Sequence, residues 1–129
     1  MKTRSLRSTF LLSLLMGLLL LQNQAFAHSA LTASVPVDGQ TLSAPAMLQL
    51  EFNGEVSLLA LSIVGKDGEV DIGFTPSADP AATHELALPA LTDGRYVVDW
   101  TIIGADGHRI SKSFSFTVDA AAAASDSAG

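Results

Sequence analysis

Apolar and polar residues alternate along four segments of this chain, at residues 48–52, 59–63, 96–103 and 110–118. An alternation with a period of two predicts β-strands that bury one face. Residues 96–103 are apolar on most of both faces, which predicts a central strand. The side chains expected to point into the core are Leu48, Leu50, Phe52, Leu59, Leu61, Ile63, Tyr96, Val98, Trp100, Ile102, Ile110, Phe114, Phe116 and Val118.

Turn signals separate these segments. Asp-Gly pairs stand at residues 38–39, 67–68, 93–94 and 106–107, and residues 75–83 read as a surface loop. Asp-Gly favours tight turns because both residues tolerate positive φ. Short strands with turns at this spacing, and no helical period after residue 27, predict an antiparallel sandwich or small barrel.

The N-terminus has the pattern of a secretory signal peptide. Three basic residues precede the mostly apolar run 10–21, and small residues follow at Ala25 and Ala27. We therefore expect cleavage after Ala27. The apolar run is shorter than the roughly 20 residues that a membrane-spanning helix needs. The predicted organisation is a cleaved signal at 1–27, one domain at 28–118 and a disordered Ala/Ser-rich tail at 119–129.

Composition excludes several classes of protein. The chain has no cysteine, and therefore no disulfide, no thiolate metal site and no lipoprotein anchor. After residue 27, four basic residues stand against thirteen acidic ones, a formal charge of −9. So acidic a chain offers no basic patch for nucleic acid or anionic lipid. No nucleophile-elbow motif and no glycine-rich phosphate-binding motif is present.

Cleavage after Ala27 makes His28 the first residue of the exported chain. The free α-amine and the ring Nδ1 of an N-terminal histidine can chelate one metal ion. The amine pKa of about 7.7–8 allows its deprotonation when a metal competes. Two nitrogens from one residue suit the tetragonal N/O sites that Cu(II) prefers. The alternative is that His28 follows the cleavage site by chance.

Asp106 and His108 lie two residues apart in the loop between the predicted strands 96–103 and 110–118. Both side chains can face one ion if the loop is extended there. Alternatively, Asp106-Gly107 only forms a hairpin turn and His108 is a solvated loop residue. The third histidine, His84, is expected to be an ordinary edge or surface residue.

Several segments together resemble one family. They are HSALTASVPVDG at 28–39, LQLEF at 48–52, GRYVVDW at 94–100, DGH at 106–108 and FSFTV at 114–118. In this order and spacing they resemble the CopC family of periplasmic copper-binding proteins, which includes YobA-like members. The resemblance implies a cupredoxin-like or immunoglobulin-like Greek-key sandwich. It also implies one Cu(II) site formed by His28, through its amine and imidazole, with Asp106 and His108.

Two features depart from the family pattern. Some members carry a methionine-rich loop for Cu(I), whereas Met47 is the only methionine after residue 27 and is expected to fill the core. Some members also place a glutamate shortly after the residue that corresponds to Phe52. Here Glu55 is displaced from that position, and no role is assigned to it.

The function expected from these residues is a non-enzymatic periplasmic carrier or buffer of Cu(II) in copper resistance or homeostasis. The family suggests a CopD-like inner-membrane copper transporter as partner; the direction of transfer stays open, and a monomer is favoured. One alternative is a histidine-brace copper oxygenase, although the Asp106 carboxylate would fill a position that O₂ chemistry needs open. Another is a metal-free adhesion or chaperone-like sandwich.

Overall fold

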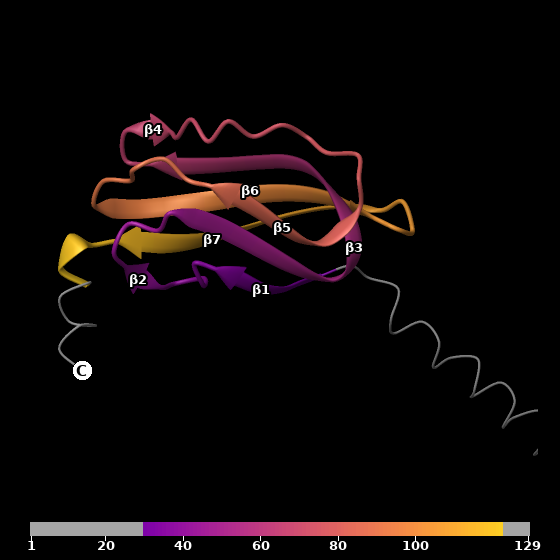
Figure 1. The fold of residues 1–129 in the computed structure, drawn as a ribbon, viewed down its shortest axis with the longest axis horizontal. Coiled ribbons are helices and arrows are strands. Elements are labelled where there is room, and N and C mark those ends of the chain that lie inside the picture. Colours follow the sequence, from indigo (N-terminus) through magenta and orange to yellow (C-terminus); the bar gives the residue numbers. More distant parts are fainter. Residues whose placement is uncertain (1–29, 123–129) are drawn as a thin grey trace, which may run out of the picture.

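The structure is a computed structural model that describes residues 30–122, and it has the predicted all-β fold (Figure 1). The predicted signal peptide, His28 and residues 123–129 lie outside the described residues. Residues 120–122 are helical, and within 30–122 no helix has the length and apolar content to cross a bilayer. The strands are β1 (Leu31–Val35), β2 (Thr41–Leu42), β3 (Met47–Gly65), β4 (Gly68–Glu69), β5 (Ala81–Ala87), β6 (Gly94–Gly104) and β7 (Arg109–Val118).

One long strand, β3, belongs to both layers of the fold. Its first part pairs with β1 and β5, and its second part pairs with β6 and, at its end, with β4. The pairing with β5 is interrupted between Glu51 and Val56, where β3 curves around one end of the molecule (Figure 1). The sequence predicted two separate strands at 48–52 and 59–63. The structure joins them because the chain stays extended through the bend.

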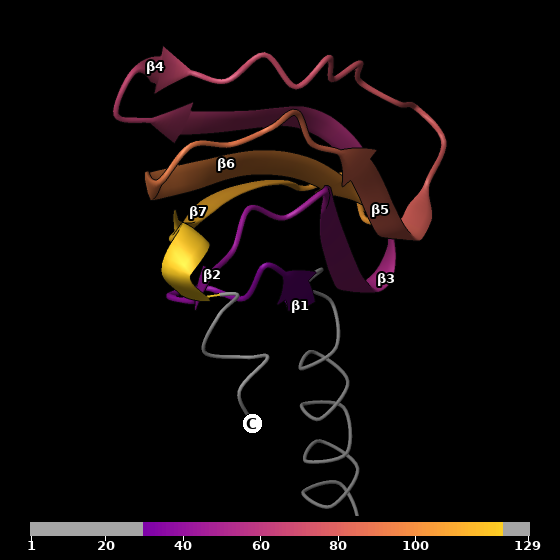
Figure 2. The same ribbon diagram turned by 60° about the vertical axis from the view of Figure 1, so that its left-hand side comes forward.

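The strands form one curled sheet in the order β1-β3-β6-β7-β2, with β4 and β5 also paired to β3. Figure 2 shows β4, the second part of β3, β6 and β7 stacked in this order. All pairings are antiparallel except that of β2 with β7. Strand β6 lies between β3 and β7, which confirms its predicted central position. The curl closes the sheet over one core, where the rings of Phe52 and Trp100 meet edge-on with centroids 5.3 Å apart.

The predicted inward face of β6 is confirmed, since Tyr96, Val98, Trp100 and Ile102 are all buried. The prediction for the second part of β3 was wrong at one position. Leu58 is buried and Leu59 is only half-buried, because a register shift between Leu58 and Ala60 reverses the alternation. An extra residue in one strand moves the side chains that follow it to the opposite face.

Two other predictions need correction. Of the expected loop 75–83, residues 81–83 belong to β5, where Thr83 pairs with Glu51. Met47 does not fill the core, because its side chain is 46% exposed. It precedes Leu48, which is buried, and consecutive strand residues point to opposite faces. All four predicted Asp-Gly turns have a glycine with positive φ.

Tyr96 fixes the end of the molecule that is opposite the β3 bend. Its ring stacks on Phe116 at 5.5 Å, and its hydroxyl donates a 2.7 Å hydrogen bond to the carbonyl oxygen of Thr92. Gly65, near the end of β3, lies against the same ring. A Cβ atom at position 65 would stand 2.7 Å from Cε1 of Tyr96. Only glycine therefore fits there without moving the tyrosine.

We expect Gly65→Ala to destabilise the protein by about 1–3 kcal/mol, since overpacking forces neighbouring groups to shift. Gly54→Ala, in the same strand, is the matched control because a Cβ atom there meets nothing within 4 Å. Its effect should stay within roughly 0.5 kcal/mol. Urea unfolding of both variants measures the difference, and equal stabilities would contradict the packing argument.

Candidate metal centre

The bend of β3 and the loop between β6 and β7 lie at the same end of the molecule (Figure 1). Val56, just after the bend, pairs with Gly104, the last residue of β6. The loop is closed by two backbone hydrogen bonds, from Gly104 N to His108 O at 3.1 Å and from Gly107 N to Gly104 O at 3.0 Å. The register of β3 with β6 thus sets the loop beside the bend.

The first described residue, Ala30, is attached to the same bend. Its backbone nitrogen donates to Oδ1 of Asn53 at 2.9 Å, and the backbone nitrogen of Asn53 donates to the carbonyl oxygen of Ala30 at 3.0 Å. The start of the described chain and the β6–β7 loop are therefore gathered at one end, although they are far apart in the sequence.

Asp106 and His108 are in direct contact in this loop. Oδ1 of Asp106 accepts the backbone N–H of His108 at 3.0 Å, and Oδ2 lies 2.9 Å from Nδ1 of the ring. The His108 side chain is 77% exposed and that of Asp106 is 32% exposed. The Asp-Gly turn thus presents a carboxylate–imidazole pair to solvent.

The contact fixes the chemistry of the pair. The side-chain hydrogen bond with His108, followed by its backbone N–H, lowers the pKa of Asp106 below the usual range. An ionised carboxylate only accepts hydrogen bonds, so the proton of the contact sits on Nδ1. In a neutral ring, Nε2 then carries the free lone pair, as in metal-binding histidines whose other nitrogen is held by a carboxylate.

His28, the third predicted donor, lies outside the described residues. Within residues 30–122, no group of three or more His, Asp or Glu side chains is close enough together to hold a metal ion. The described part of the chain thus contains two of the three residues predicted as metal ligands, Asp106 and His108.

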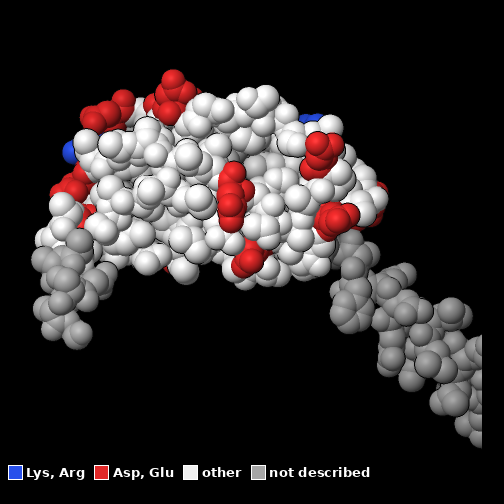
Figure 3. Space-filling model, viewed as in Figure 1, with Lys and Arg blue, Asp and Glu red and all other residues white. Residues whose placement is uncertain are grey.

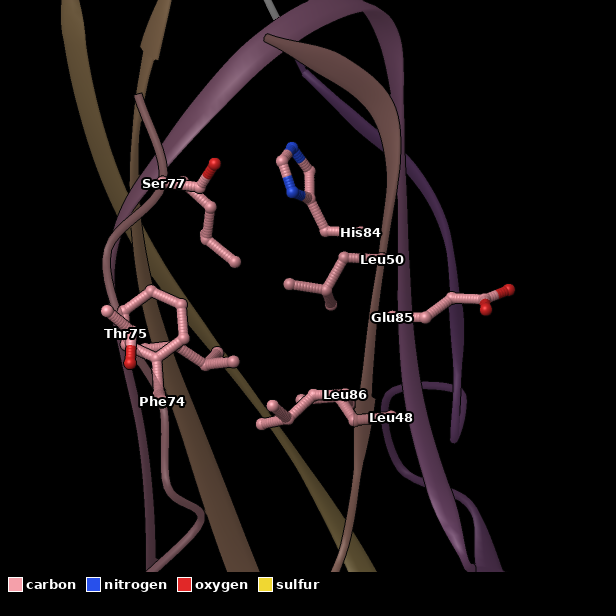
Figure 4. Close-up of a pocket in the computed structure, with 10 residues that line it drawn as sticks. Leu48, Leu50, Phe74, Thr75, Ser77, His84, Glu85 and Leu86 are labelled. Atoms are coloured by element: carbon pink, nitrogen blue, oxygen red, sulfur yellow. The ribbon is translucent and has the colours of Figure 1, made fainter. Parts of the chain in front are cut away.

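His84 has a different environment. Its Nε2 lies 2.9 Å from the carbonyl oxygen of Val56, and its ring meets Phe52 edge-on at 6.1 Å. Figure 4 shows this ring beside a mostly apolar pocket of about 170 Å³, opposite Ser77 and Phe74. Nε2 of His84 therefore forms its hydrogen bond with a backbone carbonyl, which indicates that the side chain packs the fold.

Glu55 is a neighbour of the loop that sequence reasoning left without a role. It lines a hollow of about 180 Å³ together with Gly104 and Ala105. The only signal for this position was its distance of three residues from Phe52, at the point where β3 bends. No hydrogen bond or ion pair of the described residues ties Glu55 to Asp106 or His108 in the way that these two are tied to each other.

The sequence matches the family model of the CopC domain over residues 31–119, which is more than half of the chain. The chain belongs to the CopC family. Copper resistance protein C of Xanthomonas campestris pv. juglandis is 33% identical over 104 residues, covering 73% of this chain and 82% of the relative. The match to the family model spans every strand described above.

Solved structures of CopC proteins share the fold. CopC from Methylosinus trichosporium OB3b has a TM-score of 0.60 at 33% identity, covering 71% of this chain and 94% of that chain. PcoC from Escherichia coli, described as a methionine-rich copper resistance protein, has a TM-score of 0.57 at 28% identity. It covers 72% of this chain and 100% of its own. The present chain differs from that description, since its three methionines are Met1, Met16 and Met47.

The Asp106–His108 contact predicts a measurable titration. Because the carboxylate is the form that accepts both hydrogen bonds, the contact is present above the usual Asp pKa of about 4 and is lost as pH falls through the lowered value. His108→Phe should raise the pKa of Asp106 toward the usual range. Carboxyl-carbon NMR measures it, with His84→Phe as the control; an unchanged Asp106 titration in His108→Phe would contradict the contact.

Proposed function

We propose that this protein is a periplasmic, non-enzymatic Cu(II)-binding protein that carries or buffers copper in copper resistance or homeostasis. The single observation that carries the proposal is the Asp106–His108 pair at the end of the fold where Ala30, the first described residue, is attached. The relatives named copper resistance protein C support copper as the ligand.

The proposed ligand set begins with export. Removal of residues 1–27 frees the α-amine of His28, which chelates copper together with its own Nδ1. His108 adds a ring nitrogen and Asp106 adds a carboxylate oxygen. The Oδ2–Nδ1 contact opens when both bind one ion, because the two ring nitrogens point to opposite sides of the imidazole. Three nitrogens and one oxygen form a square-planar set that suits one Cu(II) ion.

The same donors argue against Cu(I). Soft thiolate and thioether ligands select Cu(I), and the chain has no cysteine. Met47 is exposed at the start of β3, where it pairs with Ala87, far along the strand from the bend. One isolated thioether does not make a soft cluster, so we expect Cu(II) to be the bound ion.

The charge of the surface agrees with a copper carrier rather than a nucleic-acid or membrane binder. Acidic side chains are scattered over the face in Figure 3, and basic ones appear only at its margins. Such a surface attracts cations and repels phosphate backbones. The predicted signal peptide supports the periplasm as the compartment, and a CopD-like membrane transporter is the proposed partner.

The function is tested by intact mass spectrometry of the exported protein with and without Cu(II). We expect a chain that begins at His28 and gains the mass of one copper ion, because the amine–imidazole chelate exists only after that cleavage. A different first residue would remove the proposed chelate. A chain that starts at His28 and takes up no copper would favour a metal-free sandwich.

The ligands are tested one at a time with His28→Phe, Asp106→Ala and His108→Phe. Each should weaken Cu(II) binding by at least about 10–100-fold, the typical loss for a group that only supports a metal ligand. His84→Phe is the matched control, since Nε2 of His84 forms a hydrogen bond with the backbone carbonyl of Val56. This substitution should change the copper affinity little.

Competition titration gives the affinities, and electron paramagnetic resonance gives the coordination. The one-copper protein should show a tetragonal signal with nitrogen couplings that change in the His28 and His108 variants. Loss of copper in His84→Phe together with retention in His108→Phe would show that the ligand set is wrong.

A further inference from the structure

We propose that Asn53 is a positioning residue of the copper site. It holds the backbone at Ala30 and so fixes the point from which the chain runs back to His28. The inference rests on the proposed function and adds to it a residue that touches neither the metal nor its ligands.

The contact is double. The Asn53 side chain accepts the N–H of Ala30 through Oδ1 at 2.9 Å, and the Asn53 backbone donates to the carbonyl oxygen of Ala30 at 3.0 Å. The regular pairing of β1 with β3 is disturbed immediately afterwards, between Leu31 and Ala33. The asparagine amide therefore supplies the acceptor that holds the chain at the edge of the ladder.

The position of Asn53 in the fold also links Ala30 to the β6–β7 loop. It lies in the bend of β3, three residues before Val56, whose partner Gly104 is the last residue before the β6–β7 loop. Ala30 is two positions after His28, with only Ser29 between them. A link of this length reaches at most about 7 Å, because an extended chain spans roughly 3.3–3.6 Å per residue. Fixing Ala30 thus limits the volume that the terminal chelate can occupy relative to His108.

The expected benefit is preorganisation. Without the amide of Asn53, the backbone at Ala30 keeps only one of its two hydrogen bonds to position 53, and copper binding has to complete its ordering as well as that of the chelate. Ordering the backbone of one residue corresponds to roughly 5- to 30-fold in an equilibrium constant. Holding it in place beforehand raises affinity by avoiding that cost at the moment of binding.

Asn53→Ala in the exported chain should therefore weaken Cu(II) binding by up to roughly 5- to 30-fold, since the backbone hydrogen bond from position 53 to the carbonyl oxygen of Ala30 is kept. Asn53→Asp keeps an acceptor oxygen and should bind at least as tightly as the parent chain. The matched control is Thr32→Val, which removes the 3.2 Å hydrogen bond from Thr32 Oγ1 to Glu51 O in the same strand pair. It should leave copper affinity nearly unchanged, even if it lowers stability as much as Asn53→Ala does.

A second background separates positioning from general stability. One extra residue before His28 removes the terminal chelate, so Asn53→Ala should cause no further loss of affinity in that extended chain. An equal loss in both backgrounds, or none in the exported chain, would overturn the role of Asn53 and leave the copper site intact. If the parent exported chain binds no Cu(II), the proposed function fails as well.

Discussion

The arrangement at the candidate site depends on one constraint, which is that β3 passes from one layer of the fold to the other without ending. Before its bend the strand pairs with β5, at Val56 it pairs with both β5 and β6, and beyond Val56 it pairs with β6. A strand that changes layers places three things together: its own bend residues, the loop of the neighbouring hairpin and the terminus of the strand on its other edge. Ala30 and the β6–β7 loop meet the bend for this reason. The placement of the candidate site thus follows from the topology of the sheet.

Much of the sheet was predictable because alternation is a local property. The inward face of β6 was read correctly, since its apolar residues fall on one parity throughout. The error at Leu58 and Leu59 has a clear physical cause. Both are leucine, so the pattern fits either parity, and only the pairing with β6 determines which one is buried. The continuity of β3 was missed because Asn53 and Gly54 carry the composition of a turn although they lie within a strand.

The sequence likewise predicted some features of the candidate site and missed others. The spacing of Asp106 and His108 predicted that both side chains can face one ion, and the structure brings them into contact. The spacing did not reveal which ring nitrogen the carboxylate holds, because that depends on side-chain geometry. Asn53 gave no signal at all, since its partner Ala30 lies 23 residues away along the chain. Contacts of this range become visible only when the fold is known.

Exposure of the pair bears on what kind of copper site it can form. His108 is mostly in solvent, so water screens its interactions and the low dielectric of a protein interior contributes little to affinity. Binding strength then has to come from geometry fixed in advance: the turn that holds Asp106 and His108 together, and the asparagine that holds the backbone at Ala30. A metal ion bound at such a surface stays open to an incoming ligand from another protein. That accessibility suits an ion that is handed on, whereas a resident catalytic metal is usually enclosed by a shaped, water-excluding cavity.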